Sequence, residues 1–195
     1  MEAVLEAAAQ VFEAYGYAAG TTNRIAERAG VSIGTLYQYF PSKEALVVAL
    51  LERHIQETQR QMREWVGHMV TERHTLRAAL EDYIGGMLAM HVQRPRLQHI
   101  LLEETPLPTH VHLLLLDAEH QLGRTMAGLL HTFPEIPHPR LEHAAYVVIH
   151  TIEALTHRFA AHPEDTAITR EALQAELVLL MEAYLHQPSG RPSGT

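Results

Sequence analysis

The chain has 195 residues, of which 47% are hydrophobic, and it carries a formal net charge of −8 and no cysteine. These values predict a soluble, cytoplasmic chain of one or two domains with no membrane partner, since no apolar run approaches the ~20 residues that cross a bilayer. They exclude disulfides and cysteine zinc sites, and they exclude a protein that coats nucleic acid through bulk positive charge, because Lys and Arg dominate such binding.

The first segment is predicted to be an amphipathic helix over residues 1–15, because its apolar side chains recur with helical spacing. Gly16 is a natural end for this helix. A second helix of about eight residues begins after a cap at Thr21 or Thr22, and Gly30 ends it. We therefore expect two helices within the first 30 residues.

A third short helix is predicted over residues 33–39, with Ser32 as its cap and Pro41 as its end. Leu36 and Phe40 lie one turn apart and should anchor it to a core. Two short helices with a glycine in the turn between them form a helix-turn-helix, whose second helix enters the DNA major groove. The sequence thus predicts local contact with DNA.

The face of this third helix opposite its anchors is polar but uncharged. Gln pairs with adenine, Thr or Ile meets a thymine methyl group, and Tyr binds phosphates. In an isolated helix the same face would be an ordinary solvated surface, but the two-helix context favours DNA contact. The residues on this face and its edges are Ile33, Gly34, Thr35, Tyr37, Gln38 and Tyr39.

The run IAERAGVSIGTLYQYFPSKEAL, preceded by AAAQVFEAYGYAAGTT, resembles the N-terminal domain of tetracycline-repressor (TetR/AcrR) type transcriptional regulators. The resemblance implies that Tyr37, Tyr39 and Lys43 mainly hold phosphates. Gln38 is added by periodicity alone. The DNA-binding residues that the family pattern implies are Thr22, Asn23, Ile33, Gly34, Thr35, Tyr37, Tyr39 and Lys43.

Only helices are predicted beyond the third one. A long helix over residues 42–69 follows, and in related regulators it links the DNA-binding domain to the effector domain. We expect an all-α fold of about nine helices. Its predicted domains are a helix-turn-helix domain over residues 1–46, a helical effector-binding and dimerisation domain over 47–187 and a disordered tail over 188–195. The later helices are predicted over residues 76–92, 95–104, 110–132, 139–161 and 169–186.

The last two helices carry apolar stripes that, by resemblance, pair with their symmetry mates as a four-helix homodimer interface. A dimer with two recognition helices about 34 to 36 Å apart would read a palindromic operator in double-stranded DNA. The predicted interface residues are Leu141, Ala145, Val148, Ile152, Leu155, Phe159, Leu173, Leu177, Leu180, Met181 and Tyr184.

The middle of the second domain supplies candidates for a small-molecule pocket. Its Met and aromatic residues with few charges predict an apolar or aromatic effector with one or two polar groups, and ordinary core packing is the alternative. The candidate lining residues are Met62, Trp65, Met69, Tyr83, Met87, His91, Leu101, Met126, Tyr146 and His150.

Three histidines, His143, His150 and His157, recur every seven residues and share one helical face. Successive members are ~10 Å apart, too far to share an ion whose ligands lie near ~2.1 Å. An interface or structural role is preferred for this stripe over pocket lining, and pocket lining over a metal site. We predict no metal site and no cofactor. No catalytic motif is found, so we predict no enzyme.

The most consistent function is a homodimeric repressor that binds operator DNA when empty and is released by a small effector. Residues 1–45 contain three basic and five acidic side chains. This balance keeps an alternative open, namely a helical small-molecule or metal-binding protein whose helix-turn-helix no longer engages DNA.

Overall fold

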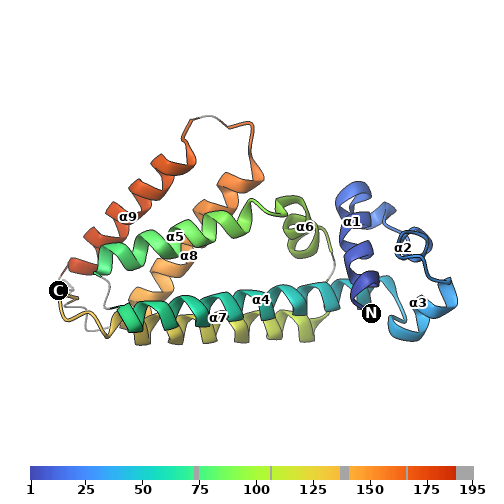
Figure 1. Cartoon of the computed structure of the whole chain (residues 1–195), viewed down its shortest axis with the longest axis horizontal. Helices are drawn as coiled ribbons and strands as arrows, with labels where there is room; N and C mark the ends of the chain where they lie inside the picture. Colours follow the sequence, from blue (N-terminus) through green and yellow to red (C-terminus); the bar gives the residue numbers. More distant parts are fainter. Residues whose placement is uncertain (73–74, 106, 137–140, 166, 188–195) are drawn as a thin grey trace, which may run out of the picture. The chain divides into compact units, whose positions relative to one another are not determined.

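A computed structural model of the chain describes residues 1–72, 75–105, 107–136, 141–165 and 167–187, without the side chains of residues 70–72 and 103. These ranges contain nine α-helices, a π-helical turn and no strand, which confirms the all-α prediction (Figure 1). The predicted helix start at Pro139 and the predicted disordered tail lie outside them. The elements are α1 (Glu2–Ala19), α2 (Thr22–Ala29), α3 (Ile33–Tyr39), α4 (Lys43–Glu72), α5 (Leu76–His91), α6 (Pro95–His99), the π turn (Ile100–Glu104), α7 (Thr109–Leu130), α8 (Leu141–Ala161) and α9 (Arg170–His186).

The chain divides into two compact units, each formed by two stretches of sequence. The first unit comprises Met1–Gln59 and Arg94–Leu116, and the second comprises Arg60–Gln93 and Asp117–Thr195. Helices α4 and α7 contribute residues to both units. The functional domain boundaries drawn from the sequence, at residues 46 and 187, stay a prediction.

The first unit is built around a small apolar core from α1, α2, α3 and the N-terminal part of α4. Phe12, Ile25 and Leu36 are completely buried in it, and Phe40 is 6% exposed. Leu36 and Phe40 therefore anchor α3 as their one-turn spacing predicts. Burying side chains of this size contributes roughly 1.5–3 kcal/mol each, which fixes which face of α3 is left outside.

Local chemistry sets the ends of α2 and α3. The Thr21 hydroxyl accepts a hydrogen bond from the N–H of Arg24 at 3.4 Å, and the Ser32 hydroxyl accepts one from the N–H of Thr35 at 3.0 Å. Gly30 ends α2 in the left-handed conformation with φ 69°, which a side chain would disfavour. The caps Thr21 and Ser32 and the stop at Gly30 are thus confirmed, whereas α1 kinks at the predicted stop, Gly16 (φ 74°), and continues to Ala19.

The predicted helix over residues 95–104 changes winding at its centre. Helix α6 continues into the π turn, and the Thr105 hydroxyl donates to the Ile100 carbonyl at 2.9 Å. Ile100 and Leu101 are both buried in the first unit. A π turn accommodates an extra residue per turn, which hydrophobic spacing in a short sequence window does not reveal.

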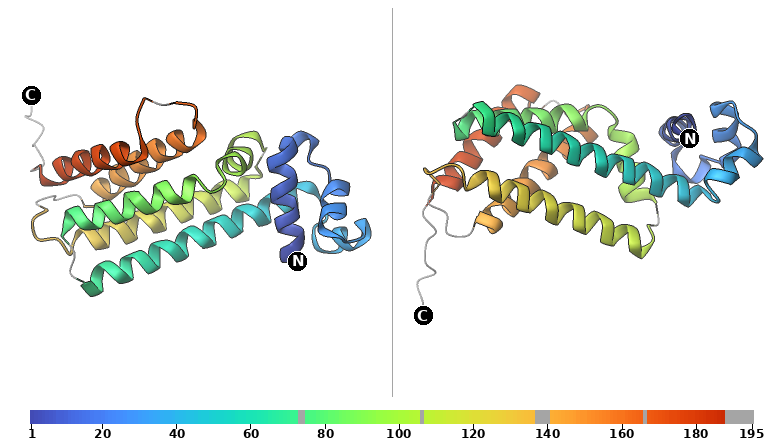
Figure 2. Two further views of the ribbon diagram at one scale, coloured as in Figure 1. Left: turned by 45° about the horizontal axis from the view of Figure 1, so that its top comes forward. Right: turned by 60° about the horizontal axis from the view of Figure 1, so that its bottom comes forward.

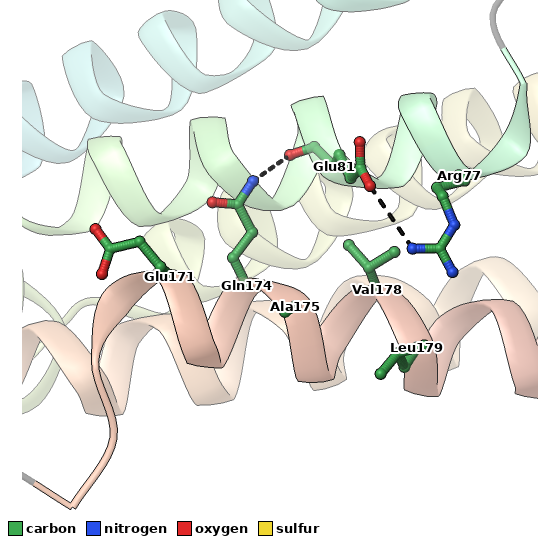
Figure 3. Close-up of a pocket in the computed structure, with 7 residues that line it drawn as sticks. All are labelled: Arg77, Glu81, Glu171, Gln174, Ala175, Val178 and Leu179. Carbon is green, nitrogen blue, oxygen red and sulfur yellow. Dashed lines mark hydrogen bonds and ion pairs between the residues drawn. The ribbon is translucent and has the colours of Figure 1, made fainter.

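In the second unit, α5 packs against both α8 and α9 (Figure 2). The approach to α9 is close at Gly85, where an added Cβ would lie 3.0 Å from the Gln174 amide nitrogen. Gln174 donates to the Glu81 carbonyl at 2.9 Å, and Arg77 lies 3.7 Å from the Glu81 carboxylate (Figure 3). These contacts border a groove of about 300 Å³ between the two helices. None of the described helices combines the length and apolar character needed to cross a membrane.

Candidate nucleic-acid interface and small-molecule site

The outer face of α3 presents its predicted reading residues to solvent. Ile33 is 39% exposed, Tyr37 47% and Tyr39 57%, and Gly34 and Gln38 are also exposed. Large apolar or aromatic side chains at this exposure are available to a ligand rather than to the core. The backbone geometry thus leaves free the surface that the sequence assigns to DNA.

Two of the predicted DNA-binding residues are joined to each other. The Thr22 and Tyr37 hydroxyls lie 3.1 Å apart and form a hydrogen bond between α2 and α3. Thr35 is partly buried, and its hydroxyl lies 2.8 Å from that of Ser32, so it supports the cap of its own helix. Asn23 is exposed at the start of α2. Contacts within the unit thus orient part of this surface before any DNA binds.

Lys43 has a structural role that sequence reasoning did not predict. Its ammonium donates to the carbonyl of Tyr17 at 2.8 Å and to that of Ala18 at 3.4 Å, and it lies 4.0 Å from the centre of the Tyr17 ring. Burial and the neighbouring Glu44 carboxylate raise the pKa of the Tyr17 phenol to about 12. An ammonium has three donors, so two carbonyls leave one donor for a phosphate.

The arginines beside α3 also make contacts inside the unit. Arg24 donates to the Ala19 carbonyl at 2.8 Å and lies 4.4 Å from the Tyr15 ring centre. Arg28 donates to Gln10 at 2.6 Å. Both guanidinium groups keep further donors, since each has five. Positive charge near α3 therefore comes from a few side chains that contacts inside the unit hold in place. This agrees with the acidic composition of the chain.

The second unit brings together most of the predicted pocket residues. Met62, Met69, Tyr83 and Met126 are buried in one core, and Trp65 and Met87 pack against it. The remaining second-unit candidates, His91, Tyr146 and His150, make polar or ring contacts.

Leu101 is not part of this group. It lies in the π turn, is 4% exposed and belongs to the core of the first unit. The structure therefore separates Leu101 from the other candidates.

Polar side chains of the second unit form a chain of contacts on α5 and α8. Thr156 donates to the Ile152 carbonyl at 2.7 Å, so its hydroxyl oxygen accepts from Nδ1 of His91 at 2.9 Å. The His91 and His157 rings meet edge to face with centres 5.7 Å apart. Sequence reasoning missed Thr156, whose type and position carry no recognisable signal.

His150 contacts two neighbours on its own helix. Its ring centre lies 4.2 Å from that of Tyr146, which is 64% exposed, and its Nδ1 lies 3.6 Å from the Glu153 carboxylate. Desolvation raises the pKa of Glu153, and the negative charge of Glu119 acts in the same direction. His150 and His157 oppose this shift. Glu153 is a further residue that the sequence did not single out.

The histidine stripe therefore has no single role. His157 points to the second-unit core, His150 pairs with Glu153, and His143 is exposed. No group of three metal-ligating side chains is found among the described residues.

Several predicted interface residues are instead buried inside their own chain. A side chain packed in this core has no surface left for a partner, so the apolar stripes of α8 and α9 serve mainly to join these helices to α5. Leu155 and Leu180 remain 38% and 50% exposed. The predicted interface residues that are buried in the second-unit core are Ala145, Val148, Ile152, Leu173, Leu177 and Met181.

Two family patterns match the chain. One, described as bacterial regulatory proteins of the tetR family, matches residues 4–50. The other, described as a tetracyclin repressor-like C-terminal domain, matches residues 75–185, which is more than half of the chain. The chain belongs to the TetR family. It is therefore a transcriptional regulator with a helix-turn-helix.

Curated relatives in the TetR family match over shorter segments. The activator FasR of Mycolicibacterium smegmatis is 41% identical over 80 residues, which are 41% of this chain and 36% of FasR. The repressor KstR of the same organism is 43% identical over 53 residues, 27% of this chain and 26% of KstR. The chain thus spans about a third or less of the length of these relatives, which include both an activator and a repressor.

Solved structures support the TetR fold over nearly the whole chain. Bacillus subtilis FadR, solved in complex with stearoyl-CoA, aligns with a TM-score of 0.72 at 19% identity and covers 92% of this chain and 96% of FadR. A transcriptional regulator of Rhodococcus sp. RHA1 aligns with a TM-score of 0.75 at 19% identity, covering 98% of each chain. At this identity the likeness concerns the fold.

Proposed function

We propose that this TetR-family regulator is a homodimeric repressor, which binds a palindromic operator through α3 and is released by a small, largely apolar effector. The observation that carries the DNA part is the solvent-exposed outer face of α3, with Leu36 and Phe40 holding the opposite face in the core. Gln38 and Ile33 would contact bases. Tyr39 and the remaining donor of Lys43 would contact phosphates.

The proposed dimer uses the apolar side chains that α8 and α9 leave outside. Leu179 and Leu180 of α9 are 51% and 50% exposed, and Val147 and Leu155 of α8 are 39% and 38% exposed. Exposed apolar side chains on neighbouring helices favour association because contact removes them from water. This surface replaces the buried part of the interface predicted from the sequence.

Sedimentation velocity tests the dimer at micromolar concentration. Leu180→Glu should convert it to a monomer, since a carboxylate would be buried without a partner. Leu116→Glu is the matched control, because Leu116 is 49% exposed on α7 and lies outside the proposed interface. A wild-type monomer, or a Leu180→Glu dimer as stable as the wild type, would contradict the proposed interface.

The proposed release mechanism uses the chain connections between the units. Helix α4 runs through both, and Arg94, which follows the first stretch of the second unit, forms an ion pair with Glu6 of α1. This pair lowers the pKa of the Glu6 carboxyl. An effector that favours another arrangement of the second unit would shift the population of DNA-binding conformations through these links.

The deciding experiment is fluorescence anisotropy with duplex DNA from the region beside the protein's own gene. Binding should weaken steeply as salt concentration rises, because phosphate contacts release counterions, and an effector should release the DNA. DNA affinity that increases with effector would support an activator instead. No binding at low salt would favour the alternative, a helical binding protein whose helix-turn-helix does not engage DNA.

A further inference from the structure

Four buried side-chain polar atoms in the described part of the chain have no hydrogen-bond partner, and three of them belong to the second unit. These three are Nε1 of Trp65, the hydroxyl of Tyr83 and Nε2 of His157. Buried polar groups are normally paired, and each unpaired one is destabilising. A cluster of such atoms therefore indicates a site where a bound molecule would supply the missing hydrogen bonds.

The three residues come from three helices and form one neighbourhood. The Trp65 and Tyr83 rings of α4 and α5 have centres 4.9 Å apart. On α8, Glu153 is close enough to Tyr83 and His157 for their electrostatic interactions to shift pKa values. The rings of His157 and His91 of α5 meet edge to face. We call these five residues the polar lining.

Glu153 is the most solvent-exposed residue of the polar lining. Its side chain is 48% exposed, as for a surface residue. The surrounding protein nevertheless desolvates the carboxylate enough to raise its pKa. The polar lining therefore extends from the buried Tyr83 and His91 to a carboxylate that water reaches.

The types of polar atom restrict the chemistry of an occupant. The indole nitrogen of Trp65 is a donor only, and the Tyr83 hydroxyl can donate beside it. Two donors on neighbouring rings fit an oxygen acceptor. The polar lining contains no Arg or Lys, and its one carboxyl group is that of Glu153, with Glu119 nearby. A carboxylate would therefore find no positive charge that is always present.

We propose that the polar lining binds the effector of this regulator, and that this effector is an uncharged molecule with an apolar body and a carbonyl-type oxygen that accepts from Trp65 and Tyr83. This inference rests on the proposed function and specifies its ligand. The Met and Leu side chains of the adjoining core, including Met62 and Met126, surround the apolar body. The histidines and Glu153 contact the polar edge of the ligand.

The chain contains a built-in reporter for this site, since Trp65 is its only tryptophan. The test uses probes that share one apolar body and differ in the polar group, namely a ketone, a carboxylate and an amine on cyclohexyl, decalin and adamantane skeletons. Thermal shift and Trp65 fluorescence measure binding without DNA. Failure of DNA binding and failure of this proposal are thus separate results.

At least one ketone should bind, about tenfold or more tighter than the carboxylate and the amine of the same skeleton. A carboxylate or amine that binds as tightly as its ketone, or the absence of binding by every ketone, would overturn the proposal.

Tyr83→Phe provides a sharper test because it keeps the ring and removes only the hydroxyl. The free variant should be at least as stable as the wild type, since an unpaired buried hydroxyl is lost, whereas ketone binding should weaken about tenfold. Tyr15→Phe, in the first unit, is the matched control and should change neither quantity. A destabilised free Tyr83→Phe protein, or unchanged ketone affinity, would show that the Tyr83 hydroxyl does not bind the ligand.

Discussion

The hydroxyl of Tyr39 offers the most direct test of the DNA-binding surface. The side chain is 57% exposed at the end of α3, and no hydrogen bond to its hydroxyl is found in the described part of the chain. Tyr39→Phe should therefore leave the fold intact while removing one bond to a phosphate. Hydrogen bonds to charged groups contribute about 1.5–3 kcal/mol, and 1.4 kcal/mol is about tenfold in affinity.

A dimer loses this bond twice, so Tyr39→Phe should weaken operator binding about 100-fold or more. Anisotropy titration at fixed salt measures the affinity, and circular dichroism checks the fold. Tyr146→Phe is the matched control, because its ring is 64% exposed on α8 in the other unit. Affinity of Tyr39→Phe within about twofold of the wild type would refute the assignment of Tyr39 to a phosphate.

Two further predictions concern charged groups. Lys43→Met should lower the melting temperature, because the carbonyls of Tyr17 and Ala18 lose their donor. It should also reduce the salt dependence of DNA binding, because one phosphate contact is lost. An unchanged melting temperature would contradict the structural role of Lys43. Glu153→Gln should raise stability at neutral pH, because desolvation raises the pKa of Glu153 and the wild type loses stability as pH rises through that pKa. The stability gained by Glu153→Gln should shrink on acidification, which thermal scans across pH would measure. The control Glu142→Gln, on the exposed side of α8, should show no such trend.

The sequence by itself determined the helix-turn-helix and the order of helices. Thr21, Gly30 and Ser32 act through hydrogen bonds and backbone angles within four residues of themselves, so local chemistry is sufficient to place the ends of α2 and α3. The spacing of Leu36 and Phe40 likewise fixes which side of α3 faces outward. For this reason the exposed face of α3, to which the sequence assigns DNA contact, could be predicted.

The tertiary structure decided which apolar and polar residues meet across helices. Periodicity shows that Ile152 and Leu177 face a neighbour but not which one, and in the structure both are buried in the core of the second unit. Leu101 packs in the core of the first unit, which its place in a predicted helix did not reveal. The polar lining from Trp65 to His157 joins α4, α5 and α8, and its unpaired atoms are defined only by what surrounds them. Contacts between residues distant in sequence leave no periodic signal, and therefore only the folded chain reveals them.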